Sequence, residues 1–204
     1  MSLHKETGGY MDGADIFRTC ILRATAVVKQ VRLDHFANAT PDTDWNVRDL
    51  LAHMTRELVA VPQTLAGSLP ADIGAATDEE LLGNNDIDLS INWQAAVDRA
   101  ERALDDIDPD EIINSAQGDM SIDDYLSQIA SDELIHAWDL GASIGVPVHF
   151  DSSLAGTVYE IASPSRQLTH DSERFAREIE IVGEADMHTK LLALFGRRAD
   201  WRAS

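Results

Sequence analysis

Apolar residues recur at spacings of three and four along four stretches of the chain, which is the period of an α-helix with one buried face. These stretches cover residues 14–38, about 45–69, about 90–107 and about 121–143. Pro62 lies inside the second stretch, where it is expected to kink or end the helix. Four amphipathic helices joined by loops predict an all-α protein built as an up-down four-helix bundle.

Capping and turn residues suggest where these helices begin and end. Thr43 or Asp44 is suited to cap the second helix. Ser121, with an acid three residues later, resembles the capping sequence of the fourth helix, which is expected to end at Gly145. Residues 70–89 are rich in Asp, Gly and Asn, so we expect a long loop there with at most one helical turn.

The chain after the fourth helix has a different pattern. Residues 152–162 suggest a short helix, and the alternation of charged and apolar residues from Glu178 to Val182 suggests a small strand. Residues 187–195 predict a final amphipathic helix closed by Gly196. We therefore expect a bundle followed by a short C-terminal extension packed on it.

Length and charge narrow the domain organisation and the partners. A chain of 204 residues fits one bundle at residues 1–146 and an extension at residues 147–204. Lys plus Arg is 16 and Asp plus Glu is 36, so the net charge is −20. Such an acidic surface repels phosphate backbones and anionic lipid, so neither nucleic acid nor a membrane surface is an expected partner. A homodimer is plausible.

Cysteine usage and hydropathy predict a cytoplasmic protein. Cys20 is the only cysteine, so no intramolecular disulfide can form, and no apolar run approaches the roughly 20 residues of a membrane span. The polar residues 1–13 lack the apolar core of a signal peptide. Because Cys20 falls on the apolar face of the first helix, we predict a buried packing thiol rather than a nucleophile.

Two polar residues interrupt the apolar face of the fourth helix. Asp132 and His136 stand where the spacing calls for Leu or Ile, and a buried carboxylate costs several kcal/mol unless a partner satisfies it. An acid and a histidine at i and i+4 project toward one point, which suits two ligands of a metal ion. A buried Asp–His hydrogen bond, or a solvated pair on a helix turned away from the core, explains the same pattern.

A metal site needs a third ligand from another helix, and His53 is the best candidate. It lies beside Leu50 and Met54 at the edge of the apolar face of the second helix. Glu57 follows at i+4, where it could be a fourth ligand, a partner of His53, a general base or half of an exposed ion pair. The residues alone leave these alternatives open.

Three segments resemble the DinB-like superfamily, most closely its branch containing mycothiol-dependent maleylpyruvate isomerase. Residues 45–53, WNVRDLLAH, are similar to a W-x-V-R-D-L-x-x-H segment of the superfamily. Residues 132–140, DELIHAWDL, are similar to the acid-x-x-x-H-x-W-D-L segment of the branch. Residues 191–197, LLALFGR, followed by Trp201, resemble the L-L-A-L-L-G-R ending of an uncharacterised, actinobacterial metal-binding subfamily. The matches span most of the chain.

The resemblance implies that His53, Asp132 and His136 hold one divalent metal ion, with water completing its coordination. Zinc is the expected metal, nickel is an alternative, and mycothiol is the implied thiol cofactor. Two departures weaken the case for maleylpyruvate as the substrate. The isomerase has Glu at the position of Asp132, and it has a full second domain where only 204 − 146 = 58 residues follow Val146 here.

Three functions compete on this basis. The first is a metal-dependent, mycothiol-dependent transferase or isomerase, in which the metal binds a small thiol as its thiolate for attack on an electrophilic substrate. The second is a non-catalytic module in which the metal joins two helices. The third is a metal-dependent hydrolase with Glu57 as the base. Three protein ligands leave an open coordination position, which favours chemistry over a closed structural site.

Overall fold

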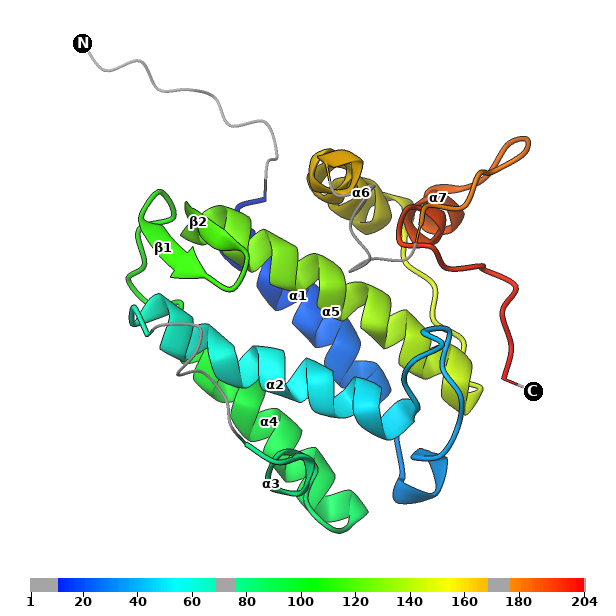
Figure 1. The fold of residues 1–204 in the computed structure, drawn as a ribbon, viewed down its shortest axis with the longest axis horizontal. Coiled ribbons are helices and arrows are strands. Elements are labelled where there is room, and N and C mark those ends of the chain that lie inside the picture. The colour runs from blue at the N-terminus through cyan, green and yellow to red at the C-terminus, as the bar shows by residue number, and fades with distance from the viewer. Residues whose placement is uncertain (1–10, 69–75, 169–176, 204) are drawn as a thin grey trace.

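A computed structural model of the protein describes residues 11–68, 76–168 and 177–203. Nearly all regular structure is helical, as the sequence predicts (Figure 1). The elements are α1 Gly13–Val28, the 3-10 turn η1 Leu33–His35, α2 Val47–Leu65, α3 Asp78–Leu82, α4 Asp86–Arg102, β1 Ile112–Ser115, β2 Gly118–Ser121, α5 Ile122–Ile144, α6 Ser152–Leu168 and α7 Met187–Leu194.

The predicted four-helix bundle is confirmed, and it consists of α1, α2, α4 and α5 (Figure 1). Contacts run around a ring in which α1 touches α5 and α4, while α2 touches the same two helices. Helix α5 is buried on most of its surface because α1, α2 and α6 all pack against it. A polar side chain in the middle of α5 therefore costs free energy unless a partner inside the protein satisfies it.

The helices run up, down, down and up rather than in strict alternation. The backbone N–H of Gly13 donates to Asp123, so α1 and α5 begin at the same end of the bundle. Leu33, beyond the end of α1, donates to Asp86 at the start of α4, so these two helices are antiparallel. The connection that contains α3 returns the chain to the end where α2 began, so α2 and α4 run in the same direction (Figure 1).

Several helix boundaries differ from those predicted. The first helix ends at Val28 rather than near residue 38, and η1 follows as a separate turn. Asn46, not Thr43 or Asp44, caps α2: its side chain accepts a hydrogen bond from Asp49 N–H, and Asp49 returns one to Asn46 N–H. This reciprocal pair starts the helix two residues later than the polar turn suggested.

The later helices also shift. Pro62 does not stop α2, which continues for three more residues to Leu65. The third bundle helix starts at Asp86 instead of residue 90, because Asn85 accepts hydrogen bonds from the N–H groups of Ile87 and Asp88. The single turn expected between residues 70 and 89 is α3, although residues 69–75 lie outside the described part of the chain.

The one small sheet lies before α5 rather than near the C-terminus. Strands β1 and β2 form an antiparallel hairpin whose register pairs Ile112 with Ser121. The residue pattern does not predict this hairpin, because four-residue strands show too few alternations of polar and apolar residues. The strand predicted for Glu178–Val182 does not form, although Ile179 N–H donates to the carbonyl of Ala193.

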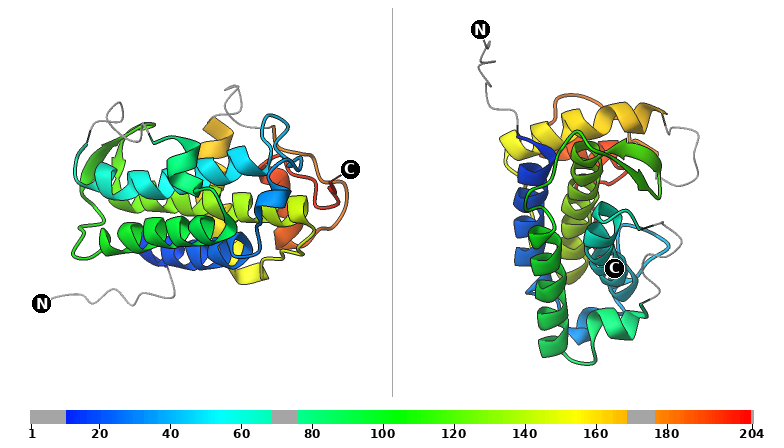
Figure 2. Two further views of the ribbon diagram at one scale, coloured as in Figure 1. Left: turned by 90° about the horizontal axis from the view of Figure 1, so that it is seen from below. Right: turned by 90° about the vertical axis from the view of Figure 1, so that its left-hand side faces the viewer.

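The C-terminal helices lie across the direction of the bundle (Figures 1 and 2). Helix α6 extends six residues beyond the predicted Ala162, to Leu168, and α7 pairs with it as the predicted final helix. Gly196 closes α7 in a left-handed conformation with φ of 72°, and Arg197 N–H then donates to the carbonyl of Leu192. Within the described residues, no helix is long and apolar enough to cross a membrane.

Candidate metal centre

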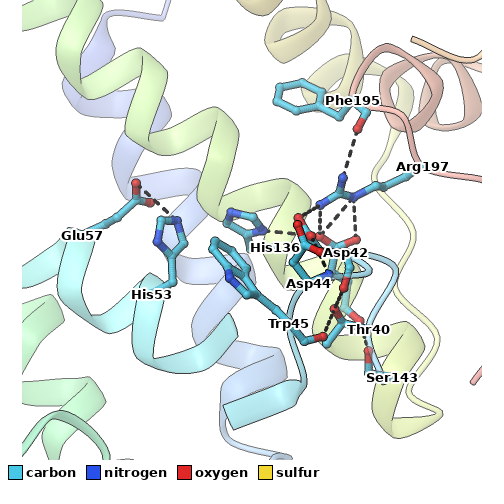
Figure 3. Close-up of polar contacts among 11 residues, drawn as sticks. Thr40, Asp42, Asp44, Trp45, His53, Glu57, His136, Ser143, Phe195 and Arg197 are labelled. Carbon is cyan, nitrogen blue, oxygen red and sulfur yellow. Dashed lines mark hydrogen bonds and ion pairs between the residues drawn. The ribbon is translucent and has the colours of Figure 1, made fainter. Parts of the chain in front are cut away.

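Two of the three predicted ligands meet where α2 begins and α5 ends. The rings of His53 and His136 are 5.2 Å apart between centroids and nearly perpendicular, at 89° (Figure 3). Trp45, just before α2, packs on both: its ring centroid is 4.6 Å from that of His53 and 5.9 Å from that of His136. The imidazoles of His53 and His136, from antiparallel helices, thus lie together in one partly buried corner, and the indole of Trp45 packs on one side of it.

A tight loop holds Trp45 in that place. Ala39 and Asn46 form an isolated β-bridge, which brings the two ends of the loop together. Inside it, the Thr40 hydroxyl lies 2.8 Å from both the Asp42 and the Trp45 carbonyl oxygens (Figure 3). Because these contacts fix the backbone at Trp45, its ring is placed by the loop and not by the histidines alone.

The third predicted ligand, Asp132, lies one helical turn before His136 on α5 and is half-buried. Its charge acts on two further acids, Glu57 of α2 and Glu133 of α5. Glu57 Oε1 is 3.5 Å from His53 Nε2, so Glu57 is a partner of His53 rather than half of an exposed ion pair (Figure 3). Arg56, its neighbour in sequence, pairs instead with Asp78 at 2.9 Å.

The acids beside the histidines have unsatisfied oxygens. Glu133 is fully buried, and neither of its carboxylate oxygens has a hydrogen-bond partner among the described residues; the same holds for Glu57 Oε2. Burial raises the pKa of Glu57, and the charge of Asp132 adds to this. Burial likewise raises the pKa of Glu133, reinforced by the charges of Glu57 and Asp132. Three buried glutamate oxygens thus have no hydrogen-bond donor in the part of the chain that the structure describes.

The electrostatics of His53 differ from those of a surface histidine. Burial, together with the neighbouring His136 and Arg56, lowers the pKa of His53 to about 3. The imidazole is therefore neutral throughout the physiological range, which is the form that can donate a lone pair to a metal.

The donor set suits a divalent cation. Two neutral imidazoles and a carboxylate are ligands that zinc and nickel accept, and the orphaned oxygens of Glu57 and Glu133 mark a place where positive charge would be stabilised. Over the described residues, however, no three His, Cys, Asp or Glu side chains are already grouped as ligands of one ion. The structure brings His53 and His136 together and places Asp132 on the adjoining turn.

Two further residues at this site, Asp139 and Arg197, were not predicted from the sequence as functional candidates. Asp139 Oδ2 is 3.3 Å from His136 Nδ1. Arg197 donates from Nε and Nη2 to Asp139 at 3.0–3.3 Å, and from Nη2 to Asp42 at 3.1 Å. Asp139 follows His136 at i+3, a spacing from which a contact between the two side chains could be predicted. Nothing in the local sequence indicates that Arg197 pairs with Asp139, because the two residues are 58 positions apart.

Comparison with known proteins identifies the bundle. The sequence model described as the mycothiol maleylpyruvate isomerase N-terminal domain matches residues 17–141, which include His53, Asp132 and His136. No curated protein and no solved structure gives a significant match. The match covers more than half of the chain and agrees with the mainly helical fold, so this chain belongs to the DinB-like family of the mycothiol maleylpyruvate isomerase N-terminal domain.

Proposed function

We propose that the protein binds one divalent metal ion through His53, Asp132 and His136 and serves a mycothiol-dependent transferase or isomerase reaction. The observation that carries the proposal is the facing pair His53 and His136, whose ring centroids are 5.2 Å apart. Beside them, buried oxygens of Glu57 and Glu133 have no hydrogen-bond partner among the described residues. Membership of a family named for a mycothiol-dependent isomerase supports the thiol. Zinc is the first candidate metal and nickel the second.

In this proposal the bound ion supplies a Lewis acid that favours the thiolate form of a small thiol over the thiol. His53 and His136 contribute nitrogen ligands from two helices, and Asp132 contributes the carboxylate. Trp45 packs against both rings. Glu57 faces His53 Nε2, where it can orient that ring.

The metal is tested by titrating purified metal-free protein with Zn²⁺ or Ni²⁺ against a competing chelator. We expect about one ion per chain, strongly weakened binding in His136→Ala and Asp132→Asn, and partial retention in Asp132→Glu. His149→Ala is the matched control, because His149 is exposed and its ring pairs with His188 away from this corner. Full metal occupancy in His136→Ala contradicts the ligand assignment.

The thiol step is tested separately by calorimetry of mycothiol binding at several pH values. Metal-loaded protein is expected to bind the thiol more tightly than metal-free protein and to release a proton on binding. Equal affinity of the two forms would remove the thiolate mechanism and leave a metal that only joins α2 to α5.

One observation favours a second candidate, a metal-dependent hydrolase. Glu57 lies beside His53 and has one buried oxygen free of hydrogen bonds to the described residues, as a general base acting on water requires. Glu57→Gln separates the two functions. A hydrolase loses ester or amide hydrolysis while still binding metal, whereas a thiol-dependent enzyme keeps its metal-dependent affinity for mycothiol.

A further inference from the structure

Arg197 joins three segments that are distant in sequence. It follows the left-handed Gly196 that ends α7, and its side chain is buried, with 8% exposed. Its guanidinium donates to both oxygens of Asp139 on α5, to Asp42 in the loop before α2, and through Nη1 to the Phe195 carbonyl at 3.3 Å (Figure 3). Burial alone lowers the pKa of Arg197, but the charges of Asp139 and Asp42 outweigh it and raise it.

The contact with Asp139 has a consequence for His136. Asp139 is completely buried and offers Oδ2 to His136 Nδ1 at 3.3 Å. A carboxylate can only accept hydrogen bonds, so Nδ1 must carry the proton of the neutral ring, and Nε2 keeps its lone pair. Arg197 holds Asp139 in one orientation, because it donates to that carboxylate through two N–H groups.

The contact with Asp42 has a consequence for Trp45. Asp42 and Trp45 belong to the same loop, and the Thr40 hydroxyl bonds to the carbonyl oxygens of both. Arg197 Nη2 therefore fixes, through Asp42, the loop that lays Trp45 on the rings of His53 and His136. The Arg197 guanidinium thus influences both the position of the proton on the His136 ring and the position of Trp45 beside the two histidines.

We propose that Arg197 is a positioning residue for this site: through Asp139 it keeps the His136 proton on Nδ1 and leaves Nε2 to face a ligand, and through Asp42 it seats Trp45 over the two histidines. The inference rests on the proposed function for the identity of that ligand, a divalent ion. It assigns a role at the site to a residue outside the segment 17–141 that matches the family. The C-terminal segment thereby completes a site otherwise built by the bundle.

The test reads the tautomer of His136 directly, in metal-free protein, by two-bond ¹H–¹⁵N NMR on ¹⁵N-histidine-labelled wild type and variants. Wild type is expected to show His136 protonated on Nδ1. Arg197→Met should populate the Nε2-protonated form, and its affinity for Zn²⁺ should fall about 10–100-fold. Arg197→Lys keeps a cation against Asp139 and should restore the Nδ1 tautomer, with part of the affinity.

Two further variants control for general loss of structure. Arg198→Met removes the next arginine, which is exposed and pairs only with exposed Asp200, so it should leave tautomer and affinity unchanged. Asp42→Asn leaves the contacts between Arg197 and Asp139 intact. It should preserve the tautomer while reducing the ring-current shifts that Trp45 imposes on the His53 and His136 signals. Asp42→Asn and Arg197→Lys decide the question if Arg197→Met does not fold.

The outcomes are separable from those of the proposed function. A folded Arg197→Met with the wild-type tautomer and Zn²⁺ affinity overturns the positioning role, as does a wild type protonated on Nε2. If wild type binds no divalent ion but the tautomer follows Arg197, the positioning role stands and the proposed metal function fails. If wild type binds the metal but the His136 tautomer is the same in the Arg197 variants, the proposed metal function stands and the positioning role fails.

Discussion

Two clusters of buried and partly buried ionisable residues meet α5 about one helical turn apart, and they differ in how their carboxylates are hydrogen-bonded. In the clamped cluster, which is Asp42, His136, Asp139 and Arg197, every carboxylate faces a hydrogen-bond donor. In the acid cluster, which is Glu57, Asp132 and Glu133, three buried oxygens of the two glutamates have no hydrogen-bond partner among the described residues.

The difference assigns different tasks to the clusters. Charges that are paired and hydrogen-bonded offset the cost of burial and hold side chains in one geometry, which suits the orientation of a histidine. Acids that repel one another in a buried site destabilise the protein until a proton or a cation arrives. The clamped cluster is therefore already stabilised and can orient His136. The acid cluster is a place where binding of a proton or a cation stabilises the protein.

The largest effect is expected from breaking the clamped cluster. Asp139→Ala leaves Arg197 buried with only Asp42 as a charged partner, and removal of one member of a buried ion pair costs about 3–5 kcal/mol. Urea unfolding of the metal-free protein measures this change. Asp200→Ala is the control, because it breaks the exposed Arg198–Asp200 pair and should leave the midpoint unchanged. Equal effects of the two variants would mean that burial of the clamp is energetically unimportant.

The acid cluster should respond with the opposite sign. Glu133→Met replaces a fully buried acid, which has no hydrogen-bond partner among the described residues, by an apolar side chain of similar length. We therefore expect the metal-free protein to gain about 1–3 kcal/mol at pH 7. Glu160→Met, at an exposed position of α6, should give no such gain. A loss of stability in Glu133→Met would show that Glu133 has a stabilising partner in solution.

The pH dependence of stability sharpens the contrast. The pKa values of Glu57 and Glu133 are raised in the folded state by burial and by neighbouring acids, so above about pH 4.3 the native protein retains protons that the unfolded chain has lost. Stability must then fall as the pH rises, by up to about 1.4 kcal/mol per pH unit for each proton retained. His53, with its pKa lowered to about 3, acts in the other direction between about pH 3 and 6.5.

Comparing wild type with the double variant Glu57→Gln, Glu133→Met cancels the contribution of His53. The stability advantage of the double variant should grow as the pH rises from 5 to 8. Unfolding free energies at four or five pH values in that range measure it. A constant difference over the range contradicts raised pKa values in this cluster.

The bundle could be read from the sequence because burial of one apolar face sets the spacing of its residues. The helix boundaries were predicted less accurately where several neighbouring polar side chains could accept hydrogen bonds from the same backbone N–H groups. Asn46 and Asn85 begin their helices by accepting hydrogen bonds from backbone N–H groups, and flanking polar residues were equally plausible caps by type. The hairpin at residues 112–121 is too short to show periodicity.

At the candidate site, too, the residues on the periodic faces of helices were predicted, whereas contacts between residues distant in sequence were not. The pattern of apolar residues indicated His53 as the candidate third ligand beside Asp132 and His136, and the structure places the rings of His53 and His136 together. The clamp could not be predicted, because Arg197 meets Asp42 across 155 positions and no periodic pattern carries such information. The resemblance noted for residues 191–197 included Arg197 but gave it no role.

The smallest expected effect concerns Cys20, which lies on α1 within reach of the charge of Glu133. Burial raises the pKa of the Cys20 thiol to about 12, and Glu133 adds to this while Arg23 opposes it. Since burial is the larger cause, Glu133→Met should leave Cys20 as unreactive as before. Labelling of native protein by a thiol reagent at pH 8 should be slow in both forms and should accelerate only when urea unfolds the chain. Rapid labelling of the native wild type would contradict a structural role for Cys20. Faster labelling confined to Glu133→Met would mean that the acid cluster, and not the packing around α1, protects the thiol.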